Sequence, residues 1–324
     1  ISKKLASLLN KDVLFNKNII NDNTLSEVNK IQNGSIMMLE NIRFNQGEES
    51  NDSEFSKKLS NLGDIYVNDA FSCSHRSHAS IEGITKYIPS YFGLQITQEI
   101  EVLKKITSEI IKPVTLIIGG SKISTKINII NNLAKKFNNI IIVGGMANTM
   151  LKHTGSKVGK SICENDCGSS IKEILYISKK FDCKITCPID VVVSKSIEGV
   201  GESKDIKEIN DDEMILDIGP KTISLIKKTI NDSNTVLWNG PAGYFENPNF
   251  QTGTKEILEI ISQKTINDKI FSVAGGGETV AAINRFKKLD SFTFVSTAGG
   301  AFLEYLEGKT LPGIKALNQN VWIK

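Results

Sequence analysis

The sequence predicts an α/β protein of two doubly wound domains with parallel sheets, joined by a long helix, with the N-terminal domain incomplete. Three observations predict this class. From Val114 onward one unit recurs, consisting of an apolar strand, a glycine-bearing turn and a helix. The 324 residues exceed what a single core usually organises. The part before Val114 shows fewer strands than an open sheet needs.

The recurring strands are short apolar or β-branched runs, which is typical of strands covered on both faces of a parallel sheet. Segments with helical spacing separate them. This alternation predicts a doubly wound domain, with strands at Val114–Ile118, Ile140–Val143, Ile189–Val193, Thr235–Trp238, Ile270–Ala274 and Thr293–Ser296.

The first part of the chain is less regular. Strands are expected at Ile36–Leu39 and Ile65–Val67, with a helix near Ser53–Leu62 between them, and Gln95–Glu109 has the pattern of one long helix. Since the sequence opens at Ile1 on a helical pattern, we interpret this part as a domain without its opening βα units. The predicted plan is an N-terminal domain at 1–94, an interdomain helix at 95–112, a C-terminal domain at 113–300 and a segment at 301–324 that returns to the first domain.

Composition limits the possible functions. The formal net charge of +3, from 39 basic and 36 acidic residues, gives no support to nucleic-acid binding. The longest apolar runs have the length of strands, so no membrane segment is expected. The pairs Cys163/Cys167 and Cys183/Cys187 are spaced more widely than usual zinc knuckles, which argues against a zinc site. The odd count of five cysteines and the absence of a recognisable secretion signal favour free thiols and a cytoplasmic location.

Candidate ligand-binding residues follow the strands. Ligands of an open parallel sheet collect at the carboxyl ends of its strands, and glycines at helix N-termini let backbone N–H groups approach an anion. One such turn is equally well explained as a tight connection, but a series of them predicts a phosphate site. Neither the P-loop spacing nor the dinucleotide fingerprint is present, which argues against a dinucleotide oxidoreductase. The turns are Gly119-Gly120, Gly144-Gly145, Asn239-Gly240, Gly275-Gly276-Gly277 and Gly299-Gly300.

Several strings resemble motifs of the phosphoglycerate kinase family and occur in that family's order over essentially the whole chain. They are Leu39-Glu40-Asn41-Ile42-Arg43-Phe44, Asn68-Asp69-Ala70-Phe71, His75-Arg76-Ser77-His78-Ala79-Ser80, Gly120-Ser121-Lys122-Ile123-Ser124-Thr125-Lys126, Trp238-Asn239-Gly240-Pro241, 274–279 and Leu311-Pro312-Gly313. The resemblance implies a glycolytic phosphotransferase that moves a phosphoryl group reversibly between 1,3-bisphosphoglycerate and Mg-ADP, giving 3-phosphoglycerate and ATP. It also implies a monomer whose partners are these small molecules.

The resemblance assigns roles residue by residue. Arg43 and Arg76 would bind the phosphate of 3-phosphoglycerate in the N-terminal domain, a task suited to a bidentate guanidinium. Lys122, Gly299 and Gly300 would be catalytic, with Lys122 meeting the transferring phosphoryl group. Phosphoryl transfer needs in-line positioning and positive charge. An acyl phosphate donor needs no general base, so the two histidines of the second string are expected to position or pack.

The remaining roles concern the nucleotide. Lys126 would bind its phosphates, Asn239 would donate to a phosphate, and Glu246 would hold the ribose hydroxyls. The helix start Gly276, Gly277, Glu278 and Thr279 would face the phosphates, with Glu278 also holding Mg²⁺. Two positions depart from the family: Glu278, where aspartate is usual, and Ala298, where glycine is usual, so that a positive φ at Ala298 would alter the hinge.

In the family, residues before the point that matches Ile1 supply further substrate contacts and an arginine central to transfer. We therefore expect this chain alone to bind nucleotide, to transfer poorly, and to gain activity from an intact N-terminal segment. The alternative is a non-catalytic adenine-nucleotide-binding protein derived from this fold. Both hypotheses predict ADP binding, and they differ over whether the reading frame extends upstream into βα-type sequence. Retention of Arg43 and Arg76 favours the enzyme.

Overall fold

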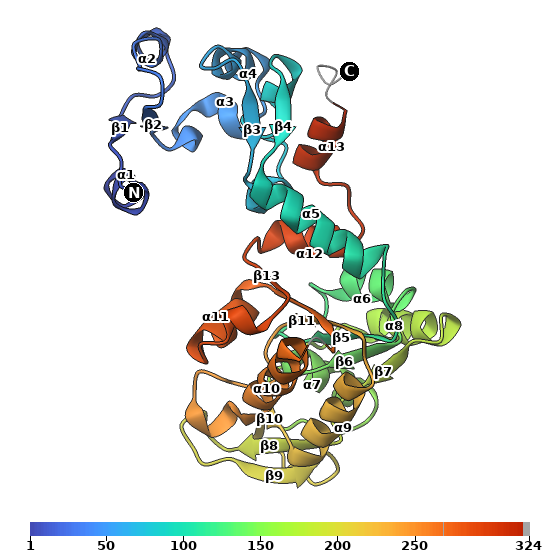
Figure 1. Ribbon diagram of the computed structural model, residues 1–324. Helices are drawn as coiled ribbons and strands as arrows, with labels where there is room; N and C mark the ends of the chain where they lie inside the picture. The colour runs from blue at the N-terminus through green and yellow to red at the C-terminus, as the bar shows by residue number, and fades with distance from the viewer. Residues whose placement is uncertain (268, 320–324) are drawn as a thin grey trace. The chain divides into compact units, whose positions relative to one another are not determined.

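The computed structural model describes residues 1–267 and 269–319, which divide into two compact units (Figure 1). Unit 1 is Ile1–Gln98 together with the segment that begins at Thr310, and unit 2 is Glu99–Lys309. The domain boundaries expected from the sequence, at residues 94, 112 and 300, stay a prediction. Within the described residues, none of the helices combines the length and apolar character needed to span a lipid bilayer.

Unit 2 is organised by a six-stranded sheet in the order β13-β12-β11-β5-β6-β7, in which every pair is parallel. All residues of β5 and of β11 are buried, as expected of apolar runs covered on both faces. The predicted α/β class with parallel sheets is therefore confirmed. The strands are β5 (Val114–Ile118), β6 (Asn139–Ile142), β7 (Lys184–Thr186), β11 (Thr235–Asn239), β12 (Phe271–Gly275) and β13 (Phe294–Ser296).

Helices cover both faces of this sheet. On one face Val236 and Trp238 of β11 share a core with Ile226 of α9 and Leu258 of α10. Alternate residues such as Leu237 point to the other face, and α6 packs there with α8 and α12. The helices of unit 2 are α6 (Ile127–Ala134), α7 (Gly144–His153), α8 (Gly168–Lys180), α9 (Pro220–Asn231), α10 (Thr252–Ile266), α11 (Gly277–Arg285) and α12 (Gly300–Leu306), with 3-10 turns η4 (Pro248–Phe250) and η5 (Leu289–Ser291).

One predicted strand belongs to a different sheet. The run expected at Ile189–Val193 forms β8 (Asp190–Ser194), which pairs antiparallel with β9 (Glu202–Asp205) and β10 (Met214–Ile218). The prediction of a sixth parallel strand there was wrong, because β7 takes that place. Pro188, which has no N–H to donate, separates β7 from β8, and the inward residues of β8 join a small core of their own.

Unit 1 contains two separate pairs of parallel strands, β1 with β2 and β3 with β4. The sequence predicted β2 and placed β3 one residue early; it did not predict β1 or β4. Helix α4 begins where the Asp52 side chain accepts from the N–H of Phe55, and it buries Phe55 and Leu59. The elements are α1 (Ser2–Leu9), β1 (Val13–Asn16), α2 (Asp22–Val28), β2 (Ile36–Leu39), η1 (Ile42–Phe44), α3 (Gln46–Glu49), α4 (Ser53–Ser60), β3 (Tyr66–Asn68), η2 (Phe71–Cys73), η3 (Gly83–Lys86), β4 (Ser90–Phe92) and α13 (Pro312–Asn318).

The boundary between the units falls inside helix α5 (Leu94–Thr107), which the sequence placed at Gln95–Glu109. The apolar stripe includes Leu103 and Ile106, both fully buried. Glu99 lies on the same stripe and is only 2% exposed, so a carboxylate takes a position where the pattern favours an apolar residue.

Candidate functional site

The candidate site of unit 2 lies at the carboxyl edge of the parallel sheet, where four loops meet. They follow β5, β6, β11 and β12, and these four strands are adjacent in the order β12-β11-β5-β6. In an open parallel sheet this edge is where ligands bind, and here the loops contain the glycines singled out from the sequence.

Lys126 lies at the centre of this edge. Its Nζ donates to the carbonyl of Gly119 after β5 and lies 3.4 Å from the carbonyl oxygen of Asn239 at the end of β11. Burial lowers the pKa of Lys126 to about 8, while the negative charge of Glu278 acts in the opposite direction. The fold therefore holds a poorly hydrated ammonium against two carbonyl groups, which an anion could displace.

Asn239 and Gly276 hold the β11 and β12 loops together. Asn239 Nδ2 donates to the carbonyl of Gly275 at 2.6 Å, while its Oδ1 is buried without a partner. Gly276 has φ +95°, and a Cβ there would lie 2.6 Å from Asn239 Nδ2, so this position requires glycine. The amide nitrogen has a second hydrogen, so the predicted donation from Asn239 to a phosphate is compatible with the bond to Gly275 and stays a prediction.

Thr279 serves the neighbouring loop. Its Oγ1 accepts from the N–H of Gly240 at 2.7 Å, and the residue is buried. Gly240 has φ +111°, which favours glycine. The side chain of Thr279 therefore links the start of α11 to the loop after β11.

A mainly apolar pocket of about 370 Å³ adjoins this network, a size typical of small-molecule sites. Of the predicted site residues, Glu246 and Glu278 line it, and both are exposed. The residues that sequence reasoning missed are the apolar walls, which carry no local signal because they come from separate loops and from β8 and β10. They include Ile162, Val191, Ile197, Met214, Leu216 and Tyr244.

A third carboxylate, Asp217, lies in the wall of the pocket. Burial raises its pKa to about 7, although the N–H groups of Gly253 and Ile218 act in the opposite direction. Its two oxygens accept from these N–H groups at 2.7 and 2.9 Å. Because Gly253 lies in the first turn of α10, Asp217 fixes the start of that helix against the pocket.

The residues present fit an Mg²⁺ ion that is held mainly by a bound phosphate. This ion takes oxygen ligands and commonly keeps one or two carboxylates, waters and substrate oxygens. Glu278 supplies one exposed carboxylate, and the unpartnered Oδ1 of Asn239 is a second oxygen on the neighbouring loop. Within residues 1–267 and 269–319, no group of three or more His, Cys, Asp or Glu side chains could hold a metal by itself.

The predicted catalytic residues lie on two loops of unit 2. Lys122 is exposed in the loop after β5, and Gly299, with φ +55°, precedes α12, which begins at Gly300. Ala298 is buried and is not among the residues with positive φ. Alanine therefore adopts this backbone without strain, and the hinge change considered from the sequence does not arise.

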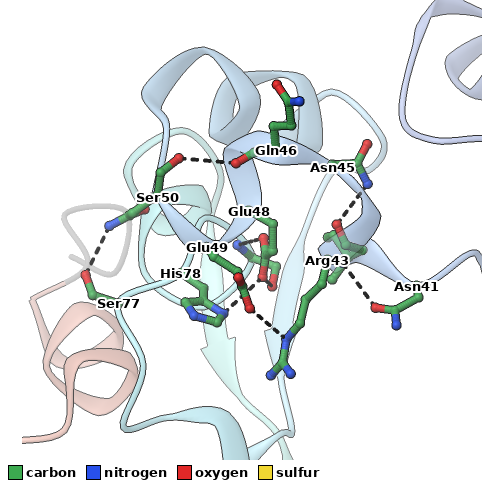
Figure 2. A network of polar contacts seen from close by, with 12 residues as sticks. Asn41, Arg43, Asn45, Gln46, Glu48, Glu49, Ser50, Ser77 and His78 are labelled. Atoms are coloured by element: carbon green, nitrogen blue, oxygen red, sulfur yellow. Dashed lines mark hydrogen bonds and ion pairs between the residues drawn. The ribbon is translucent and has the colours of Figure 1, made fainter.

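Arg43 and Arg76 lie in unit 1, Arg43 in η1, within the connection that follows β2, and Arg76 in the loop after η2. Both are exposed. Arg43 Nε lies 3.8 Å from Glu49 Oε1, and Figure 2 shows the two side chains directed toward each other. Exposed pairs of this kind contribute little to stability, so the guanidinium of Arg43 remains free to bind an anion.

Glu48 ties these two loops together. Its buried carboxylate accepts from the N–H and hydroxyl of Ser80 at 3.0 and 2.6 Å, and His78 Nδ1 lies 3.6 Å from Glu48 Oε1 (Figure 2). Since Glu48 is on α3, directly after the Arg43 turn, the loop that carries Arg76 is anchored beside it. His78 therefore packs against the Glu48 carboxylate, and a positioning or packing role is what the sequence predicted for it.

Comparisons with known proteins agree with this geometry. The model of the phosphoglycerate kinase family matches residues 1–309. Proteins named phosphoglycerate kinase from Xanthobacter autotrophicus and Rhizobium meliloti are 42% and 44% identical, over 98% of this chain and 81% and 80% of theirs. The solved phosphoglycerate kinase of Coxiella burnetii has a TM-score of 0.89 at 36% identity and covers 98% of this chain and 80% of its own. That of Pyrococcus horikoshii has a TM-score of 0.83 at 27% identity, with 98% and 81% covered.

The predicted recognition and the predicted kinase function are thus confirmed. Sequence identity and backbone similarity both extend over nearly all of the chain. The activity is that of a phosphotransferase which binds ATP in glycolysis. The chain belongs to the phosphoglycerate kinase family.

Proposed function

We propose that the edge of unit 2 binds Mg-ADP or Mg-ATP and that the two arginine loops of unit 1 bind 3-phosphoglycerate or 1,3-bisphosphoglycerate. One observation carries the nucleotide assignment: the poorly hydrated ammonium of Lys126 contacts the carbonyl groups of Gly119 and Asn239, beside an apolar pocket. A charge kept in so poorly hydrated a place costs stability, which is typical of a functional group.

The pocket supports a division of the nucleotide into two parts. The base would pack on the apolar walls, and the exposed carboxylate of Glu246 would accept hydrogen bonds from the two ribose hydroxyls. The phosphates would then reach the N–H groups at the start of α11 and the ammonium of Lys126. Bound Mg²⁺, held by Glu278 with Asn239 Oδ1 nearby, would neutralise charge on the phosphate oxygens.

Transfer itself would depend on position and charge. Lys122 would stabilise the negative charge that spreads over the equatorial oxygens of the moving phosphoryl group, and Gly299 and Gly300 would offer backbone N–H groups to it. Arg43 and Arg76 would hold the other end of the triose by its phosphate. His75 and His78 take no proton, because the acyl phosphate and the carboxylate need no general base.

The small molecules named above are the proposed partners, and we propose a monomer in the cytoplasm. The five cysteines are free thiols, which supports a reducing compartment. Sedimentation at micromolar concentration tests the proposed monomer, since a stable dimer would contradict it.

The test of the nucleotide site is titration calorimetry of the chain with Mg-ADP. Lys126→Met should weaken ADP binding at least about tenfold, because a poorly screened phosphate contact is lost. The matched control is Lys172→Met on the exposed face of α8, which should leave affinity unchanged. No measurable ADP affinity in the unmodified chain would refute the assignment.

A coupled assay with 1,3-bisphosphoglycerate tests transfer. Arg43→Ala and Arg76→Ala should raise KM for 1,3-bisphosphoglycerate without changing ADP affinity, since they contact only the triose phosphate. A non-catalytic nucleotide binder predicts ADP binding without turnover, with or without an intact N-terminal segment. An N-terminal segment that adds no activity would contradict the expectation derived from the sequence.

A further inference from the structure

A short segment between α7 and α8 connects the two ends of the candidate nucleotide site. We call Ile162–Asn165 the strap. Ile162 lines the apolar pocket, yet its side chain is 70% exposed. An apolar side chain at the mouth of a pocket gains burial when a flat ring packs against it.

Two hydrogen bonds hold the backbone of the strap to helix α7. Asn148 Nδ2 donates to the carbonyl of Ile162 at 3.1 Å, and the N–H of Glu164 donates to Thr149 Oγ1 at 3.1 Å. Both Asn148 and Thr149 are buried. The backbone of the strap is therefore held by two side chains of one helix, and the Glu164 side chain is left free to reach elsewhere.

Glu164 reaches the loop that carries Lys122. Its carboxylate accepts from the N–H of Ser124 at 3.0 Å and from the Ser124 hydroxyl at 2.5 Å. Burial would raise the pKa of Glu164, but the hydrogen bonds from Ser124, Cys167 and the backbone of Ile123 together outweigh it and the pKa is lowered. The contact is thus a charge-assisted double hydrogen bond to a loop 40 residues away in the sequence.

This contact completes the anchoring of the Lys122 loop. Ile123 is fully buried and fixes the loop on its inner side, and Thr125 Oγ1 donates to the carbonyl of Lys122 at 2.9 Å. On the outer side the strap supplies the Glu164 bonds to Ser124. These bonds connect the exposed part of the Lys122 loop to a segment outside its own turn.

We propose that Glu164 is a positioning residue for Lys122, and that the strap couples the filling of the apolar pocket to the order of the Lys122 loop. Packing of an adenine ring on Ile162 would steady the strap, and the Glu164–Ser124 bonds would pass that order to the loop two residues from Lys122. The proposal rests on the proposed function of the pocket and of Lys122.

Hydrogen–deuterium exchange of the full chain tests the coupling without relying on activity. Adenosine has no phosphate and cannot reach Lys122 electrostatically, so it isolates the effect of the pocket. We expect saturating adenosine to slow exchange in the peptide that contains Ser124 severalfold in the unmodified chain, and to have no such effect in Glu164→Gln. Glu173→Gln, the same chemical change on the exposed face of α8, should behave like the unmodified chain.

Kinetics separate positioning from a structural role. Glu164→Gln should lower kcat about fivefold to tenfold while KM for ADP changes less than about twofold, because Lys122 acts on the transition state. Ser124→Ala should lower kcat as well, and the double variant should be no worse than Glu164→Gln, since both remove one interaction.

The outcomes distinguish this proposal from the assignment on which it rests. If adenosine does not compete with ADP, or if Lys122→Ala leaves kcat unchanged, the proposed site is wrong. If adenosine competes and Lys122→Ala lowers kcat, but Glu164→Gln exchanges and turns over like Glu173→Gln, the positioning role of Glu164 is refuted. Additive losses in the double variant would also refute it.

Discussion

Glu99 should make the protein less stable as the pH rises. This carboxylate is 2% exposed on helix α5, accepts one hydrogen bond from the Ser296 hydroxyl at 3.2 Å, and leaves its Oε2 without a partner. Burial raises its pKa from 4.5 to about 7, although Ser296 acts in the opposite direction. We predict that Glu99→Gln, which keeps the shape and removes the charge, stabilises the chain above pH 7.

The magnitude follows from linkage. A pKa that moves from 4.5 to about 7, at about 1.4 kcal/mol for each pH unit, corresponds to about 3 kcal/mol. Between these two values the folded chain holds a proton that the unfolded chain has lost, so the free energy of unfolding falls as pH rises. The protonated carboxyl is fully stabilising below pH 4.5, and that stability is lost as pH passes 7. Glu99→Gln should thus gain about 3 kcal/mol at pH 8 and about nothing at pH 4.5.

Urea unfolding followed by circular dichroism, at pH 5 and pH 8, measures this difference. Comparison of variant with parent at each pH cancels the contributions of Asp217 and Lys126, whose pKa values are shifted in both chains. Glu101→Gln, on the exposed face of the same helix, is the matched control and should show no pH-dependent gain. A gain for Glu99→Gln that is equal at pH 5 and pH 8 would refute the reasoning, because burial of charge would then not be its source.

Three further predictions concern the nucleotide loops. Lys126→Met should leave the free energy of unfolding at pH 7 unchanged or higher while it weakens ADP binding, because the fold keeps that charge poorly hydrated; a clear loss of stability in a urea melt would contradict this. Gly276→Ala should destabilise by about 1–3 kcal/mol through its φ of +95° and the clash with Asn239, whereas Gly277→Ala, whose Cβ meets nothing within 4 Å, serves as the stability control. Glu278→Gln should reduce the gain in ADP affinity that Mg²⁺ provides, measured by calorimetry with and without Mg²⁺; an undiminished gain would remove Glu278 from the metal site.

Much of the site was predictable because its chemistry is local. The turns after β5 and β12 combine glycine with lysine or acid directly after an apolar strand, and backbone sterics alone require glycine at a position such as Gly276, with φ +95°. The carboxyl edge is shared by all strands of a parallel sheet, so Lys126 and Asn239 could be expected on the same edge before their contact was known.

The less predictable features depend on residues far apart in the chain. Local sequence did not reveal that Asn239 Nδ2 bonds Gly275 across 36 positions, or that its Oδ1 is buried without a partner. The strand at 190–194 has the apolar pattern of a parallel member, yet it pairs antiparallel with β9 and β10. Periodicity reports which faces of a strand are buried, and it does not report which strand lies beside it.

The sequence by itself therefore determined the α/β class, the glycine-bearing turns and the kinds of side chain offered to a phosphate, because these follow from backbone sterics and from burial patterns over a few residues. The tertiary structure alone decided that Lys126 lies against two carbonyl groups, that the carboxyl group of Glu99 is buried, and that Glu164 accepts hydrogen bonds from Ser124. Desolvation and long-range hydrogen bonds arise only when distant segments pack together, so no local pattern can encode them.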